Sequence, residues 1–354
     1  MVHLKDEVTL TVNAGDCVDV VSHGQGFLSL DARFSTGMGI PIITLVFSLI
    51  DQRDIRCFRQ GENATVILGV KSGDVYLNGK VLKTELVSTT QHHELKVHIA
   101  QGIDFTNDFL AFYHKGPSTE AIQKIMSRYF NVRNEAIVPG DTMSWMGYGI
   151  ARRIAMNIWF RSYYGGSNFL LVGNDQFGVR MIDVVSAAKS VKWKLGNDPG
   201  DDAKIDTIHV ENRKPLVQDG LDKDVLSDPI ISKVRHVLHK PDPKPFITSE
   251  IIKWRKGRRQ VMEYQYSIKG PVHGGWSEAL AANTGYFSVL RPVVTVSFFH
   301  YLPVQVFDGV QLDVRDTYPQ LELGGRYIIG PIRITIKDGR FEMILGLLRE
   351  ELVI

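Results

Sequence analysis

Few residues in the chain have types and spacing that could support chemistry, and the first candidates are histidines. His236 and His239 in "RHVLHK" are three residues apart, a spacing that would place both on one face of a helix, as two metal ligands would need. A zinc site requires three or four ligands in a fixed geometry. Neither a cysteine nor a second histidine pair lies near this segment. We therefore predict no metal site.

Catalytic and cofactor-binding motifs are also missing from the sequence. It contains no G-x-S-x-G, H-E-x-x-H, P-loop or G-x-G-x-x-G motif. The glycines in "HGQGF" (23–27) and "GGW" (274–276) lack the strand-to-helix context that phosphate binding requires. A carboxylate pair about 5–10 Å apart would suit glycoside cleavage, but no residue points to one. We predict no catalytic residues and no cofactor.

The densest cluster of charge is basic and lies in "KWRKGRRQ" (253–260). Its cations, interleaved with an aromatic residue, could contact nucleic acid or an acidic protein surface. A solvated loop face is the simpler interpretation in a chain so near neutrality. If the run binds anything, we expect an acidic patch on a partner subunit. The candidate interface residues are Lys253, Arg255, Arg258 and Arg259.

Bulk properties describe a neutral globular protein. The 354 residues suffice for two or three domains, and a net charge of +2 argues against a dedicated nucleic-acid binder. Cys17 and Cys57 are too few for a disulfide framework, so we expect two free thiols in a reducing compartment. The most apolar run, residues 39–50, contains a proline and is too short to span a bilayer. No export signal is visible in "MVHLKDEVTL", which favours assembly in a cytoplasm.

The elements that must carry these residues fall into three segments. Residues 1–105 alternate at period two between turn signals, which predicts a β-barrel or β-sandwich. Residues 106–195 switch to helical periodicity. We expect helices over 116–130, with Ser118 as N-cap, and over 141–166.

A hairpin follows in "NFLLVGNDQFGVRMIDV" (168–184), with a polar tip of four or five residues around Asp175. Because aspartate is common in turns and no other reactive side chain is near, we interpret this hairpin as structural. Residues 196–354 return to β-structure after an irregular insertion at about 215–285. The paired runs in "VILGVKSGDVYLNGKVLKTEL" and "ITIKDGRFEMILGLL" suggest that the two β-rich ends have similar barrel folds.

This order of parts resembles the central baseplate hub of contractile-tailed phages. The resemblance is carried by "GPSTEAIQKIMSRYF", by "SWMGYGIARRIAMNIWFRSYYGGSNFLLVGNDQFGVRMIDV" and by the closing "GVQLDV…GGRYIIGPIRITIKDGRFEMILGLL". It covers about two thirds of the chain as a pattern, and residues 196–275 do not align. It implies an α+β chain in which two tube-type antiparallel β-barrel domains flank a helix–helix–hairpin module.

The resemblance also implies a function without catalysis. Hubs of this kind are homotrimers whose two barrels per subunit form a six-fold-like ring, and they join the hexameric tail tube to the trimeric central spike and other baseplate proteins. It implies residence in the virion tail baseplate after assembly in the host bacterial cytoplasm, with no membrane segment and no specific nucleic-acid binding. The alternatives are a tail-associated cell-wall hydrolase, or the equivalent hub of a bacterial contractile injection system.

Overall fold

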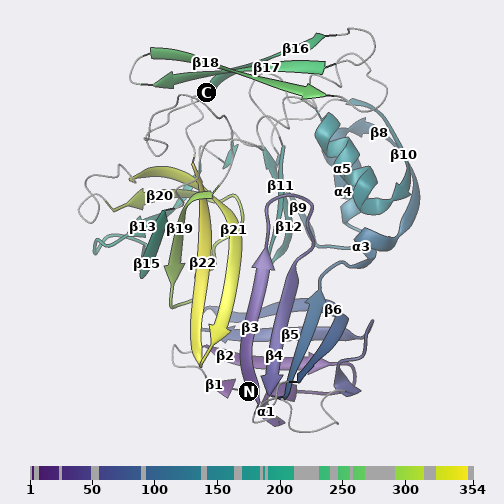
Figure 1. The fold of residues 1–354 in the computed structure, drawn as a ribbon, viewed down its shortest axis with the longest axis vertical. Helices are drawn as coiled ribbons and strands as arrows, with labels where there is room; N and C mark the ends of the chain where they lie inside the picture. The colour runs from purple at the N-terminus through teal and green to yellow at the C-terminus, as the bar shows by residue number, and fades with distance from the viewer. Residues whose placement is uncertain are drawn as a thin grey trace.

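Strands dominate the fold, and the helices are short (Figure 1). The computed structural model describes residues 2–3, 8–23, 26–48, 56–88, 93–136, 142–162, 170–183, 186–187, 190–210, 231–239, 246–255, 258–267, 292–314 and 324–349. Most of the strands in these residues belong to one 14-stranded sheet, and three small sheets accompany it. The chain is therefore richer in β-structure than the predicted α+β class suggests.

The N-terminal region is a curled antiparallel sheet. Its strands are β1 (Val2–His3), β2 (Thr9–Ala14), β3 (Phe27–Phe34), β4 (Ile42–Ser48), β5 (Asn63–Val70), β6 (Gly73–Ser88) and β7 (His93–Ala100), with the short helix α1 (Val20–His23) between β2 and β3. Alternate residues of β2 and β5 are buried, as the period-two sequence pattern predicts. In the described residues of 1–105, the expectation of an all-β segment is thus met apart from α1, the helical residues 56–57 and the start of a further short helix at Asp104.

The C-terminal region is built from strands that lie on both sides of a long intervening segment. They are β13 (Val191–Gly196), β14 (Ala203–Lys204), β15 (Thr207–Val210), β19 (Pro292–Phe298), β20 (Gly309–Asp313), β21 (Gly325–Lys337) and β22 (Arg340–Arg349). The sheet continues from the N-terminal strands into these strands through the pair β3–β21.

The two regions share one strand order. The N-terminal order is β2-β5-β6-β7-β4-β3, and the C-terminal order is β13-β20-β21-β22-β19-β15. If β1 and β14 are set aside and each set is numbered along the chain, both orders read 1-4-5-6-3-2. One pair differs, because β13 runs parallel to β20 whereas β2 runs antiparallel to β5.

The seam between the regions is an antiparallel pairing of β3 with the second half of β21, from Phe34 opposite Ile332 to Ser29 opposite Lys337. Figure 1 draws these purple and yellow strands side by side. A single hydrophobic core runs beneath them from the N-terminal to the C-terminal strands. Across the seam, Arg333 Nε donates to Asp31 Oδ1 at 2.8 Å.

The middle module has a second, separate core. Its elements are α3 (Asp104–Asn107), β8 (Phe109–Pro117), α4 (Ser118–Met126), β9 (Val132–Asn134), β10 (Thr142–Ile150), α5 (Ala151–Arg161), β11 (Leu170–Asp175) and β12 (Gly178–Asp183). The helices α4 and α5 pack inside a curved ribbon formed by β8 and β10 (Figure 1). The predicted helix near 116–130 is confirmed at α4, although Pro117 and not Ser118 is its N-cap residue.

The predicted helix over 141–166 is wrong in its first half. Among the described residues of this stretch, 142–150 form β10 and 151–161 are helical. In β10 the buried Trp145 alternates with the exposed Met146 and Tyr148, a strand pattern. Gly149 has φ +144°, which no helix accommodates. The apolar spacing of the true helix had been extended backward through a glycine-rich strand.

The insertion at about 215–285 contains ordered strands where irregular structure was expected. β16 (Ile231–His239), β17 (Phe246–Arg255) and β18 (Arg258–Ser267) form a separate antiparallel sheet. The prolines and the basic run had obscured the alternation within each strand.

The expectation of two free thiols is also wrong. Cys17 and Cys57 are joined in a disulfide that links residues 40 positions apart in the N-terminal region. The count of two cysteines could not reveal the pairing, because it depends on how the strands bring the Cys17 turn to the segment before β5.

Reduction of this disulfide should destabilise the protein. Closing a loop of this length restricts the unfolded chain, so we expect reduction to lower the free energy of unfolding by about 4 kcal/mol. Urea unfolding with and without dithiothreitol measures the loss. The double variant Cys17→Ser/Cys57→Ser is the control and should be insensitive to the reductant. Two titratable thiols in unreduced, denatured protein would contradict the disulfide.

Candidate functional site

The hairpin predicted at 168–184 is present, and it is more deeply buried than a simple surface hairpin. β11 and β12 pair from Leu170 opposite Asp183 to Asp175 opposite Gly178. The turn is therefore the two residues Gln176 and Phe177, shorter than the predicted tip of four or five residues. Every residue of β11 is buried, so both faces of the hairpin are covered.

The polar residues at the end of β11 connect all three parts of the described chain. Asn174 Oδ1 accepts a hydrogen bond from Ser35 N at 3.0 Å, and Asn174 Nδ2 donates to Gly39 O at 2.7 Å, in the N-terminal region. Gln176 Nε2 donates to Val304 O at 2.8 Å in the C-terminal region. The hairpin thus fixes the middle module to both β-regions.

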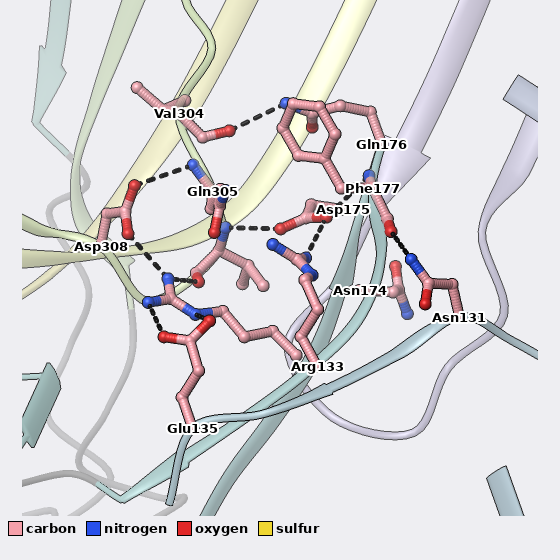
Figure 2. Close-up of polar contacts among 12 residues, drawn as sticks. Asn131, Arg133, Glu135, Asn174, Asp175, Gln176, Phe177, Val304, Gln305 and Asp308 are labelled. Carbon is pink, nitrogen blue, oxygen red and sulfur yellow. Dashed lines mark hydrogen bonds and ion pairs between the residues drawn. The ribbon is translucent and has the colours of Figure 1, made fainter. Parts of the chain in front are cut away.

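Asp175, which the sequence presented as an isolated turn residue, is fully buried and well supplied with donors (Figure 2). Its Oδ1 accepts from Phe177 N at 2.8 Å and from Arg133 Nη2 at 2.6 Å. Its Oδ2 accepts from Val306 N at 3.1 Å. The carboxylate therefore closes the turn and also binds the C-terminal region.

Arg180 is the largest fully buried side chain and lies at the centre of an ion cluster. Its Nε and Nη2 donate to the two oxygens of Glu135 at 3.1 and 2.7 Å. Its Nη1 donates to Asp308 Oδ1 at 2.7 Å and to Val306 O at 2.8 Å. Lys192 Nζ lies 2.9 Å from the same Asp308 oxygen. A charged guanidinium is tolerated here because its donors face two carboxylates and a carbonyl.

The pKa values of the cluster are shifted in opposite directions. Burial raises the pKa of Asp308, but hydrogen bonds from Lys192 and Arg180 and the charge of Arg180 outweigh it and leave that pKa below its ordinary value. Burial lowers the pKa of Arg180, and Glu135 and Asp308 outweigh that effect and raise it. Both groups are held in their charged forms, which suits a structural tie and not a general acid or base.

A close backbone approach accompanies the cluster. A Cβ at Gly173 would lie 2.8 Å from Phe307 Cζ, so only glycine fits without displacement. Phe307 itself is buried with φ +67°, a conformation that is strained for a non-glycine residue. The packing between hairpin and C-terminal region holds this residue in place.

The structure brings the four predicted interface cations to one end of one hairpin. Lys253 and Arg255 end β17, and Arg258 and Arg259 begin β18. Arg255 pairs opposite Arg258, and Trp254 opposite Arg259. The run expected to be a loop is therefore the tip of a β-hairpin. Such a tip concentrates positive charge within a few residues.

A surface that the sequence did not reveal lies on the β8–β10 ribbon. Phe109, Tyr113, Met146 and Tyr148 are exposed on its outer face, the last two at 76% and 80%. The rings of Phe109 and Tyr148 pack edge to face, with 4.7 Å between the ring centroids. A cavity of about 390 Å³ opens between β10 and α5 beside them. The sequence pattern that indicates this surface is the alternation in "TMSWMGYG", which the prediction of a helix over these residues overlooked.

Among the described residues, no group of three or more His, Cys, Asp or Glu side chains could hold a metal ion. No helix in this part of the chain has the length and apolarity that a bilayer span needs. His236 and His239 lie on strand β16 and not on the helix considered from the sequence.

Removal of the Asp308 charge should destabilise the protein strongly at neutral pH. Asp308→Asn leaves Arg180 buried with one carboxylate fewer, for which we expect a loss of about 3 kcal/mol in chemical unfolding. Because the pKa of Asp308 is lowered by folding, its contribution is present above pH ~4 and is lost as the pH falls through the folded value. The difference between wild type and variant should therefore shrink below pH ~4.

Asp31→Asn is the matched control. Asp31 also accepts hydrogen bonds from arginines, but it lies at the rim of the seam and is more exposed than Asp308. We expect it to cost about 1 kcal/mol or less. Equal losses for both variants, or a difference that does not change with pH, would contradict the role assigned to the buried cluster.

Comparison with known proteins gives structural matches only. No protein-family model matches the chain, and no curated protein matches its sequence. The 43 kDa tail protein of prophage MuSo2 from Shewanella oneidensis superposes with a TM-score of 0.59 at 11% identity, covering 97% of this chain and 98% of that one. A tail protein from Neisseria meningitidis MC58 superposes with a TM-score of 0.55 at 10% identity, covering 97% and 96%. Across nearly its whole length, the chain has the fold of phage tail proteins.

Proposed function

We propose that the protein is the structural hub of a contractile phage tail baseplate, a homotrimeric adaptor between the hexameric tail tube and the trimeric central spike. The observation that carries this proposal is the strand order 1-4-5-6-3-2, present twice in one chain. Three copies of a chain with two similar β-regions supply six similar units, so one ring can match both a six-fold and a three-fold partner. The full-length similarity to phage tail proteins supports the same assignment.

In this proposal the two β-regions are tube-type barrel domains and the middle module is the scaffold between them. The domain limits expected from the sequence are 1–105, 106–195 and 196–354, with the segment at about 215–285 inserted in the last, and we move the start of the last domain back so that it includes β13 (Val191–Gly196). The protein acts in the virion tail baseplate after assembly in the host cytoplasm. Its partners are itself, the tail tube protein, the central spike and other baseplate proteins.

The proposed role is not enzymatic. The charged groups around Arg180 are committed to one another, because the guanidinium donates to both Glu135 and Asp308. A tail-associated cell-wall hydrolase is the alternative from another class, and it would require a carboxylate pair facing a cleft. The equivalent hub of a bacterial contractile injection system has the same architecture and differs only in the particle it belongs to.

The trimer can be tested directly. We expect light scattering or mass photometry to give three times the subunit mass of 39.8 kDa for the protein alone, or that mass plus the mass of the spike for the complex with its spike. A stable monomer in both samples would contradict the proposal, and release of sugar or peptide from cell walls would favour the hydrolase.

The basic hairpin tip is proposed to guide attachment to an acidic surface of an adjoining tail component. Changing Lys253, Arg255, Arg258 and Arg259 together to Ser should slow or weaken attachment to tube or spike, and the effect should fade as salt rises. Surface charges contribute little to stability, so the thermal midpoint should hardly change. Binding kinetics at two or more salt concentrations provide the measurement.

A second quadruple variant removes the same charge elsewhere. Arg59, Lys115, Lys124 and Arg128 are exposed cations of the N-terminal region and the middle module. Their replacement by Ser should leave attachment close to wild type. If the two quadruple variants attach at the same rate at every salt concentration, the hairpin tip has no guiding role.

A further inference from the structure

The seam inside the chain provides a template for a contact between chains. The second half of β21 has β22 on one side and β3 on the other. In this seam Ala32 lies opposite Ile334, and Leu30 lies opposite Ile336. These residues are buried, and Ile334 has no exposed surface. A strand from one β-region thus completes the sheet of the other.

Because the two regions share one strand order, each strand of the seam has an equivalent. Both β21 and β6 are fifth along the chain in their regions, and both β3 and β15 are second. Individual residues of the two regions can be matched through the pairing of the third strand with the sixth, which both regions contain. Phe47 pairs opposite Leu95 as Phe298 pairs opposite Met343.

This match extends to the strands that form the seam. Leu86 lies opposite Leu95, as Ile334 lies opposite Met343, so Leu86 is the equivalent of Ile334. By the same reasoning Val210, opposite Val294, is the equivalent of Ala32, opposite Ile43.

The equivalent edges are unpaired within the described part of the chain. The ladder between β6 and β5 ends at Lys80, and Val81 still exchanges backbone hydrogen bonds with Gly61 and Glu62. From Lys83 to Ser88, the described residues pair β6 with β7 alone. In the same way β15 pairs with β19 alone. Leu86 is 61% exposed, although it points to the same sheet face as the buried Leu95 and its equivalent Ile334 is covered. An apolar residue on an open strand edge is a site for another strand.

We propose that β15 of a second copy pairs antiparallel with the second half of β6 and so repeats the β3–β21 seam between subunits. The register transferred from the internal seam places Val210 opposite Leu86, His209 opposite Val87 and Ile208 opposite Ser88. The contact is head to tail, because each copy offers β6 on one side and β15 on the other, and such contacts close into rings. This inference rests on the proposed trimer and specifies how its subunits join.

Engineered cysteines test the register. In a sheet, residues directly opposite have Cα atoms about 4.5–5.5 Å apart, within the range a disulfide spans. We expect the variant Leu86→Cys/Val210→Cys to give a covalent trimer under mild oxidation, seen on a non-reducing gel. The native cysteines are already joined to each other, so they do not compete.

The control is Tyr76→Cys/Val210→Cys. Tyr76 is exposed on the first half of β6, where β5 already occupies the edge. We expect this pair to cross-link at least ten times more slowly. A native trimer in which both pairs cross-link at the same rate would overturn the seam and leave the proposed hub intact. A protein that remains monomeric with and without its spike would overturn both.

A charge at the proposed seam gives an independent measurement. Leu86→Arg should shift the trimer toward monomer at a given concentration, because it places a cation opposite an apolar strand. Since Leu86 is exposed in the subunit, the thermal midpoint of the monomeric variant should match wild type below its assembly concentration. A normally folded Leu86→Arg variant that trimerises like wild type would contradict the seam.

Discussion

Backbone hydrogen bonds between β3 and β21 determine how the rest of the molecule is arranged. They join strands from opposite ends of the chain, so the N-terminal and C-terminal regions share one sheet and one apolar core. A core built from residues so distant in sequence can form only after much of the chain has been made, because β21 (Gly325–Lys337) lies near the end of the chain. The two β-regions are therefore coupled in stability and act as one body.

The middle module depends on the same arrangement but is held by different forces. Its own core is apolar, and its attachment to the β-regions is largely polar, through Asn174, Asp175 and Arg180. Polar contacts are directional, so they fix the orientation of the hairpin more strictly than apolar burial would. This explains why a segment without reactive side chains carries so many buried charges. The charged groups of the hairpin fix its position relative to the two β-regions.

The sequence indicated local structure well and long-range pairing poorly. Alternation in "TLTVNA" and the spacing of Ile122, Ile125 and Met126 predicted β2 and α4 because those patterns reflect which face is buried. The helix over 141–166 was wrong in its first half because its apolar residues also fit a helical period, although Gly147 and Gly149 disfavour a helix interior. The partners of Arg180 could not be predicted, since Asp308 is 128 residues away along the chain.

The internal repeat shows the same limit. The stretches "VILGVKSGDVYLNGKVLKTEL" and "ITIKDGRFEMILGLL" suggest the repeat, but they are not equivalent, because the first spans the fourth and fifth strands of its region and the second spans the fifth and sixth. The structurally equivalent stretches are "ITLVF" (43–47) and "VTVSF" (294–298), which share a Thr and a terminal Phe. Only the strand order identifies them, because so short a similarity arises often by chance.

The reversed direction of β13 breaks the equivalence of the two regions at one position. A ligand that touches only the five strands common to both regions meets the same backbone geometry twice in each chain. A ligand that reaches β2 or β13 meets amide groups oriented in opposite directions along the two strands. A partner that binds twice per chain can therefore use the five common strands of both regions. A partner that binds once per chain can be selected by contacts to β2 or to β13.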